Sequence, residues 1–187
     1  HFWDDSKKIL RKDKNFNWFL VARFLSQFAS MGFSFYIIYA LRRFNMDTVT
    51  AGYLTATLTI SQTIANAGMG WLGDKFGHRR MLVTGAIAAF LSSLLAWNAT
   101  SLAWFYPIFI LSGLTNVSIW TIGMAMTVDF GTEAERPIYI GLSQTLIAPA
   151  TILAPLLGGW IADSIGFTST FSISTILSIA MFFILVF

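Results

Sequence analysis

Long apolar runs separated by short polar segments organise this chain. Six such runs occupy most of the sequence after residue 15. A helix needs about 20 apolar residues to cross a hydrocarbon core of about 30 Å, and each run is close to that length or longer. The pattern therefore predicts six transmembrane helices. Their expected ranges are 16–41, 50–72, 80–97, 102–128, 138–162 and 167–187.

The first two predicted helices each carry polar residues on one face, at the spacing i, i+4, i+7 and i+11. Such a stripe faces protein or a water-filled cavity, because lipid would leave its polar groups without hydrogen bonds. The third and sixth predicted helices have no comparable stripe, and we expect them at the lipid-facing periphery. The stripes consist of Arg23, Gln27, Ser30 and Ser34 in the first helix and Thr55, Thr59, Gln62 and Asn66 in the second.

The composition agrees with an all-α integral membrane protein. Hydrophobic residues make up 56% of the chain and charged residues 11%, whereas a typical soluble domain has about 25% charged residues. The sequence has no cysteine, which excludes disulfides and thiolate metal sites within it. Because no predicted span carries a central Asp, Glu or His, we expect no proton coupling through a buried carboxylate in this chain. Both histidines lie outside the predicted spans and Asp129 and Asp163 lie on opposite faces, so we expect no intramembrane protease or other enzyme, and neither a metal site nor a cofactor is expected.

The basic residues are distributed unevenly about the predicted spans. Nine lysines and arginines lie in residues 1–15 and in the loops after the second and fourth spans, whereas the opposite side has only Arg42 and Arg43. Basic residues concentrate on the cytoplasmic side of membrane proteins. We therefore predict a multi-pass protein of the cell membrane with both termini cytoplasmic. The net charge of +3 follows from these loops, and no nucleic-acid partner is expected.

A short pattern occurs twice at a constant offset. Residues 70–77, GWLGDKFG, recur as GWIADSIG at residues 159–166. Each copy ends the middle helix of a group of three, which divides the chain after the 1–15 linker or amphipathic segment into repeats 16–97 and 102–187. Because three is odd, the second repeat must be inverted in the membrane relative to the first.

The segment GWLGDKFGHRR at residues 70–80 resembles the loop signature of the major facilitator superfamily of transporters. Each six-helix half of that superfamily consists of nested 3+3 inverted repeats. The resemblance implies one half of a secondary active transporter, which moves a small solute by alternating access as the two halves rock. The complete signature favours the N-terminal half. The basic segment before residue 16 and the start without Met favour a fragment beginning at the C-terminal half, which we prefer.

The resemblance also implies a gate at the cytoplasmic loops. The Asp74 carboxylate is expected near a helix N-terminus of the opposite half, where the helix dipole favours negative charge. At the same membrane face, Arg80, Asp129 and Arg136 are expected to form an ion-pair cluster. A solvated turn with no gating role is the alternative. The gate candidates are Gly70, Gly73, Asp74, Lys75, Gly77, Arg79, Arg80, Asp129 and Arg136.

Hydrogen-bonding side chains and one aromatic residue are candidates for a substrate cavity, and they suit a small polar or amphipathic solute. The alternative is hydrogen bonding between helices, worth about 0.6 kcal/mol for each bond. Arg23 can contribute to the cavity or extend its guanidinium to the membrane surface, and both possibilities stay open. The cavity candidates are Arg23, Gln27, Thr59, Gln62, Asn66, Asn116, Trp120 and Gln144.

Two partners are compatible with these features. In the leading interpretation the partner is the other six-helix half of the same transporter. In the alternative, the chain is a stand-alone six-helix membrane protein that homodimerises to form a transporter or pore. Six further spans before residue 1 would support the first interpretation, and a start codon at that position would support the second.

Overall fold

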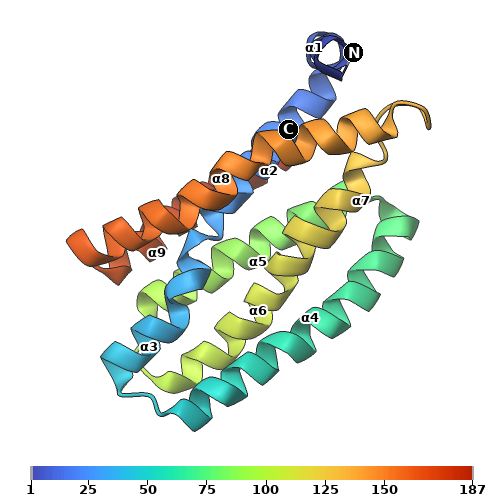
Figure 1. The fold of residues 1–187 in the computed structure, drawn as a ribbon. Helices are drawn as coiled ribbons and strands as arrows, with labels where there is room; N and C mark the ends of the chain where they lie inside the picture. The colour runs from blue at the N-terminus through green and yellow to red at the C-terminus, as the bar shows by residue number, and fades with distance from the viewer. Residues whose placement is uncertain (1, 187) are drawn as a thin grey trace.

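Long helices joined by short turns account for almost all of residues 2–186, the part of the chain that the computed structural model describes (Figure 1). A short helix α1 (Phe2–Lys12) precedes the bundle. The first predicted span comprises α2 (Lys14–Ala29), η1 (Met31–Phe35) and α3 (Tyr36–Phe44). The second and third spans are the continuous helices α4 (Thr48–Phe76) and α5 (His78–Asn98).

The second half of the chain has the same general plan. The fourth span comprises η2 (Leu102–Trp104), α6 (Phe105–Val117), η3 (Ser118–Ile122) and α7 (Gly123–Thr127). The fifth and sixth spans are α8 (Arg136–Ser164) and α9 (Phe167–Val186). All six predicted runs therefore lie on helical stretches.

Five of these stretches are long and apolar enough to cross a membrane: Lys14–Phe44, His78–Asn98, Leu102–Thr127, Arg136–Ser164 and Phe167–Val186. The helix outside this set is α4. Its 29 residues make it about 44 Å long at 1.5 Å per residue, which exceeds the hydrocarbon thickness. The prediction of six spans is thus met by α4 in length but not in apolarity, because its polar side chains lower its hydropathy.

Two spans that we expected to be continuous helices are interrupted. In the first, the chain tightens into the 3₁₀ turn η1, where the Gly32 amide donates a hydrogen bond to Ser174 Oγ at 3.1 Å. In the fourth, η3 is a π-helical turn. Insertions of this kind bend a helix and change which side chains face its neighbours. Both interruptions lie near the middle of the bundle.

The repeated segments are equivalent in the backbone. The helices that carry them, α4 and α8, run in opposite directions, as an inverted repeat requires (Figure 1). A glycine with positive φ follows each helix: Gly77, with φ 94°, comes directly after α4, and Gly166, with φ 111°, comes two residues after α8 ends at Ser164. A non-glycine residue would be strained in this conformation. Trp71 and Trp160 are also similarly exposed, at 64% and 65%.

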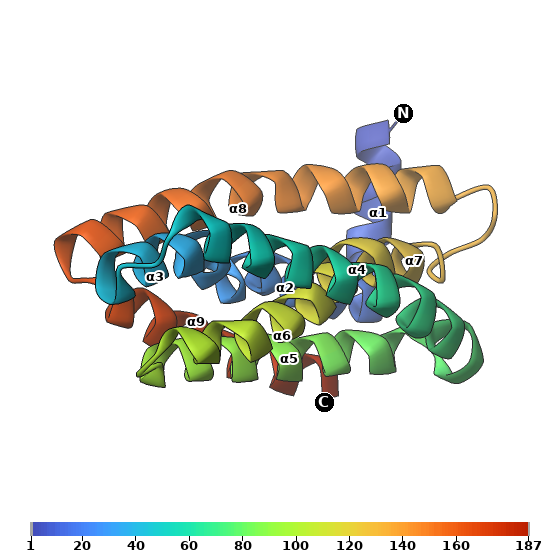
Figure 2. The same ribbon diagram turned by 90° about the horizontal axis from the view of Figure 1, so that it is seen from below.

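The helices form layers, with α4 and α8 on one side of the bundle and α5 and α9 on the other (Figure 2). We expected α5 and α9 to be peripheral, and they do form an outer layer. They also pack closely against each other, where Thr175 Oγ1 donates to Ser93 Oγ at 3.0 Å. Small hydroxyl side chains thus allow the two apolar helices to approach closely.

The N-terminal segment is a helix attached to the bundle. Asp13 caps α2 by accepting a hydrogen bond from the Phe16 amide at 2.9 Å, and its other carboxylate oxygen accepts from the Tyr139 hydroxyl at 3.2 Å. Ile9 of α1 is buried. Of the two alternatives for residues 1–15, the helical one therefore agrees with the structure from Phe2 onward, while His1 lies outside the described residues.

We predict that a single methyl group at Gly113 of α6 destabilises the bundle. An added Cβ would lie 2.7 Å from Ser61 Cβ and 3.1 Å from the Gln62 amide nitrogen of α4. Overpacking of this kind costs about 1–3 kcal/mol. Gly113→Ala should lower the thermal midpoint of the full-length protein in detergent. The matched control is Gly68→Ala, because no atom lies within 4 Å of that added Cβ. Equal midpoints for the two variants would contradict the packing argument.

Candidate functional site

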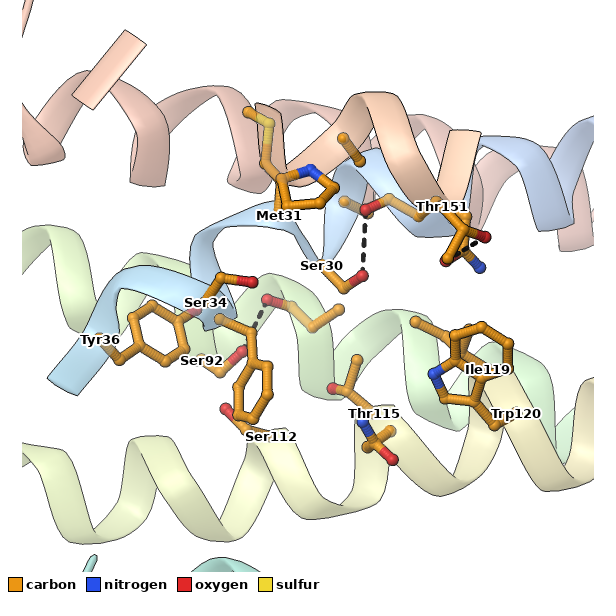
Figure 3. Close-up of a pocket in the computed structure, with 17 residues that line it drawn as sticks. Ser30, Met31, Ser34, Tyr36, Ser92, Ser112, Thr115, Ile119, Trp120 and Thr151 are labelled. Atoms are coloured by element: carbon orange, nitrogen blue, oxygen red, sulfur yellow. Dashed lines mark hydrogen bonds between the residues drawn. The ribbon is translucent and has the colours of Figure 1, made fainter. Parts of the chain in front are cut away.

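A polar pocket of about 160 Å³ lies in the interior of the bundle (Figure 3). The buried apolar residues of the bundle form two clusters. One contains Phe16 and Phe19. The other contains Phe105, Phe171 and Tyr36, which also lines the pocket. The polar and aromatic side chains that line the pocket are Gln27, Ser30, Phe33, Ser34, Tyr36, Ser92, Ser112, Thr115, Asn116, Trp120 and Thr151.

The interruptions of the two broken spans provide much of this lining. Ser30 and Ser34 lie at the start and within the 3₁₀ turn η1, while Ile119 and Trp120 belong to the π-helical turn η3. Figure 3 shows these side chains pointing toward one another from opposite walls. Both three-helix units contribute to the pocket, so the site depends on their packing together.

The pocket lining is neutral and rich in hydrogen-bond acceptors. The hydroxyls of Ser92, Ser112 and Thr115 donate to carbonyl oxygens of their own helices at 3.0, 2.7 and 3.0 Å. This back-bonding satisfies each donor and leaves oxygen lone pairs for a ligand. Gln27 Oε1 accepts from Thr151 Oγ1 at 3.5 Å, which links α2 to α8. No charged side chain is among the described residues that line the pocket.

Arg23 lies outside the pocket, one turn before Gln27. Its side chain is only 3% exposed, which rules out extension to the membrane surface. Nη2 donates to the Ile119 carbonyl at 3.3 Å, and the guanidinium lies 5.9 Å from the Phe19 ring centroid. Nε and Nη1 are buried without a hydrogen-bond partner among residues 2–186. The Arg23 side chain therefore contacts the π-helical turn η3 through its hydrogen bond to the Ile119 carbonyl.

Gln27, Asn116 and Trp120 line the pocket as expected, whereas the other predicted cavity residues do not. Asn66 Oδ1 accepts from Thr121 Oγ1 at 3.0 Å on the exposed side of α4. The Gln144 amide contacts Met124 Sδ at 3.4 Å. The stripe of α4 lies on the open face of the bundle, outside this pocket. The candidates outside the pocket are Arg23, Thr59, Gln62, Asn66 and Gln144.

Few sequence patterns identify the serines and threonines of the pocket as lining residues. Ser30 and Ser34 continue the stripe that contains Gln27, so they were detectable in principle. Ser92 lies in a span without a stripe, where a hydroxyl bonded to its own helix is indistinguishable from a packing residue. The π-helical turn shifts the helical register by one residue, and no simple periodicity reveals this.

A charged cluster occupies the end of the bundle where α4 meets α5 and α7 leads to α8. His78 Nδ1 lies 2.6 Å from Asp129 Oδ2, and His78 Nε2 lies 3.6 Å from Asp74 Oδ1. His78 thus connects the first signature loop to the second charged loop. The chain turns at Gly77, and His78 is the first residue of α5. From this position its side chain reaches Asp129 in the second charged loop.

This pairing differs from the one that we expected. Asp129 pairs with His78 and not with Arg80 or Arg136, and Arg136 instead lies 3.6 Å from Glu133 in its own loop. Arg80 is exposed two residues beyond His78, because the helix turns it away from Asp129. The sequence had suggested His78 only as part of a basic run, so its role as the connecting residue was missed.

The remaining signature residues have distinct local roles. Gly73 is buried, and an added Cβ there would meet His78 Cδ2 at 3.0 Å. Lys75 Nζ lies 5.2 Å from the Trp71 ring centroid and 5.4 Å from that of Phe76. Arg79 Nε donates to the Leu185 carbonyl at 2.6 Å, which ties α5 to the end of α9. Gly70 has open space around it.

These features define a class of protein. An all-helical membrane chain whose two inverted three-helix units enclose a polar pocket has the architecture of a transporter half. The family model of the Major Facilitator Superfamily matches residues 19–187. The chain belongs to this superfamily, as the loop signature had indicated.

Individual relatives are transporters that extend well beyond this chain. Multidrug resistance protein 2 of Bacillus subtilis is 28% identical over 157 residues, which cover 83% of this chain and 39% of the relative. A Na(+), Li(+), K(+)/H(+) antiporter of Planococcus maritimus is 31% identical, covering 79% and 37%. The class B tetracycline resistance protein of Escherichia coli is 28% identical, covering 73% and 33%. The chain thus spans less than two fifths of each of these relatives.

We predict that Arg23→Met leaves the thermal stability of the full-length protein unchanged or raises it. Arg23 is buried with two unpaired nitrogens, and replacement of a buried ionic group by an apolar residue of similar volume is often neutral or stabilising by about 1–4 kcal/mol. Thermal unfolding in detergent measures the effect. Arg42→Met, at an exposed position, is the control. A large loss of stability confined to Arg23→Met would show that the single bond to Ile119 outweighs desolvation.

Proposed function

We propose that this chain is one six-helix half of a secondary active transporter and that its polar pocket forms part of the path of a small polar solute. The observation that carries the proposal is the neutral, acceptor-rich pocket lined by both three-helix units. A solute that loses water there needs replacement hydrogen bonds. Gln27, Asn116 and Trp120 supply side-chain donors, and the hydroxyl oxygens supply acceptors.

The proposed mechanism is alternating access. The interruptions η1 and η3 adjoin the pocket, and Pro149 and Pro155 lie within α8 on its other side. At such positions the backbone can bend at low cost, because the regular helical hydrogen bonds are already altered. Small rotations there would open the pocket toward one side of the membrane or the other.

The charged cluster is proposed as the gate at the cytoplasmic end. Support comes from His78, which joins Asp74 and Asp129 across two loops, and from the concentration of basic residues at these loops. When the cytoplasmic end opens, these loops must separate and the contacts of His78 with Asp74 and Asp129 must break. The cluster would therefore favour the state that is closed on this side.

The proposed partner is the other six-helix half of the transporter, docked on the face formed by α4 and α8. Large apolar side chains on this face are exposed, among them Ile64 at 67% and Leu156 at 64%. They alternate with the polar residues Thr59, Asn66 and Gln144, as expected for a surface that covers a hydrated solute path. A second copy of this chain is the alternative partner, and the molecular mass of the purified full-length protein distinguishes the two.

We expect a cysteine at Thr115 to react with a membrane-impermeant maleimide from both sides of sealed vesicles. Thr115 lines the pocket, and the chain has no cysteine of its own. The full-length protein, with any cysteine elsewhere removed, is the test molecule. The control is Thr170→Cys, since Thr170 is fully buried outside the pocket and should stay unlabelled. Labelling of Thr115→Cys from neither side, or from one side only, would contradict alternating access through this pocket.

We predict that Asp129→Asn raises labelling of Thr115→Cys from the cytoplasmic side several-fold, because it weakens the contact that closes this end. The matched control is Glu133→Gln, an exposed acidic residue of the same loop whose ion pair is with Arg136. Glu133→Gln should leave the labelling ratio unchanged. The gate assignment fails if both variants change the ratio of cytoplasmic to opposite-side labelling equally, or if neither changes it. Labelling of Thr115→Cys from both sides would still support the solute path in that case.

A further inference from the structure

A second hollow, about 710 Å³ in volume, lies at the end of the bundle where α2 and α5 begin and α9 ends. We call it the terminal groove. Its lining includes Asn15, Trp18, Phe19, Arg79, Phe130 and Phe183. The neutral pocket described above shares none of these residues. The groove therefore needs a separate explanation.

The terminal groove is amphipathic along its length. Aromatic rings form its walls, and two of them are open to the surroundings, since Trp18 is 61% exposed and Phe183 is 53% exposed. Arg79 and Asn15 supply the polar groups. In a membrane-spanning bundle, exposed rings at this position contact lipid chains, while the polar groups contact headgroups.

Arg79 is held in a fixed orientation. Its Nε donates to the Leu185 carbonyl at 2.6 Å, so one edge of the guanidinium is bound to the end of α9. No other hydrogen bond of Arg79 occurs among residues 2–186. The terminal amino groups are therefore available to an acceptor, and a guanidinium binds phosphate oxygens through two parallel N–H bonds.

The depth of the groove matches the headgroup region of a bilayer. Asn15 and Arg79 are each the second residue of a helix. Trp18 lies one turn into α2, where an interfacial aromatic residue is expected. The polar end of the groove thus lies at the membrane boundary, and its aromatic walls extend toward the hydrocarbon.

Charge decides which lipid the groove selects. No acidic side chain is among the described residues that line it, whereas the neighbouring hollow beside α1 mixes both signs, with Asp13 and Glu135 beside Lys8, Lys12 and Lys14. Basic pockets between helices on the cytoplasmic side attract anionic headgroups. An uncompensated arginine above aromatic walls therefore favours a phosphate-bearing lipid of net negative charge.

We propose that the terminal groove is a binding site for one anionic phospholipid, with its phosphate on Arg79 and Asn15 and an acyl chain along Trp18, Phe19 and Phe183. The site is independent of the transported solute, and it holds whether the partner is another half or a second copy. Arg79 directly follows His78, so the bound phosphate lies beside the charged cluster.

Native mass spectrometry of the full-length protein tests the site. The purified protein is titrated with phosphatidylglycerol and, separately, with phosphatidylcholine of identical acyl chains. We expect one phosphatidylglycerol to be retained with at least tenfold higher affinity than phosphatidylcholine. Equal retention of the two lipids would overturn the proposal. Displacement of the lipid by millimolar inorganic phosphate would also overturn it, because a soluble anion would then be the occupant.

Two matched variants locate the binding. Arg79→Gln should lower the affinity for phosphatidylglycerol at least tenfold, whereas Arg80→Gln, at the adjacent exposed position outside the groove, should leave it unchanged. Equal losses in both variants would indicate diffuse surface attraction and refute a defined site. Phe183→Gln, which retains the guanidinium, provides a second test should Arg79→Gln unfold. It should reduce retention of both lipids relative to the unmodified protein, and an unaltered affinity would refute the acyl-chain contact.

Discussion

The absence of water in the hydrocarbon core is the constraint on which this structure depends. Backbone and hydroxyl groups there must find partners within the protein. Thr55, Thr59 and Thr63 of α4 each donate to the carbonyl oxygen four residues earlier. The same back-bonding satisfies the pocket hydroxyls and leaves only acceptor capacity unused. A pocket can therefore exist in an apolar bundle while the donors of Ser30, Ser92, Ser112, Thr115 and Thr151 stay paired.

The two interruptions inside the spans, η1 and η3, lie beside the pocket, where polar protein groups are near. The 3₁₀ turn η1 and the π-helical turn η3 both adjoin the pocket, so their altered backbone faces protein and not lipid. Arg23 contributes to the same arrangement by donating to the Ile119 carbonyl within η3. Its Nε and Nη1 are buried without a hydrogen-bond partner among residues 2–186.

The two ends of the bundle differ in chemistry although their backbones are related. At one end, Gly77 is followed by His78, which contacts Asp129 and Asp74. At the equivalent turn after α8, Gly166 is followed by Phe167, which lies in an aromatic group with Phe35 and Tyr39. The two related turns thus carry a His–Asp cluster at one end of the bundle and an aromatic group at the other. Next to His78, Arg79 Nε donates to the Leu185 carbonyl of α9.

The sequence by itself determined the all-helical membrane fold, the positions of the spans and the repeat that ends at Gly77 and Gly166, because helix length, hydropathy and positive-φ glycines are local properties. It also identified Gln27, Asn116 and Trp120 as polar residues of the interior. Only the tertiary structure decided that the stripe of α4 faces outward, that Ser92 and Thr151 line the pocket, and that Asp129 pairs with His78. These outcomes depend on how each helix is rotated against its neighbours, and periodicity within one helix does not contain that rotation.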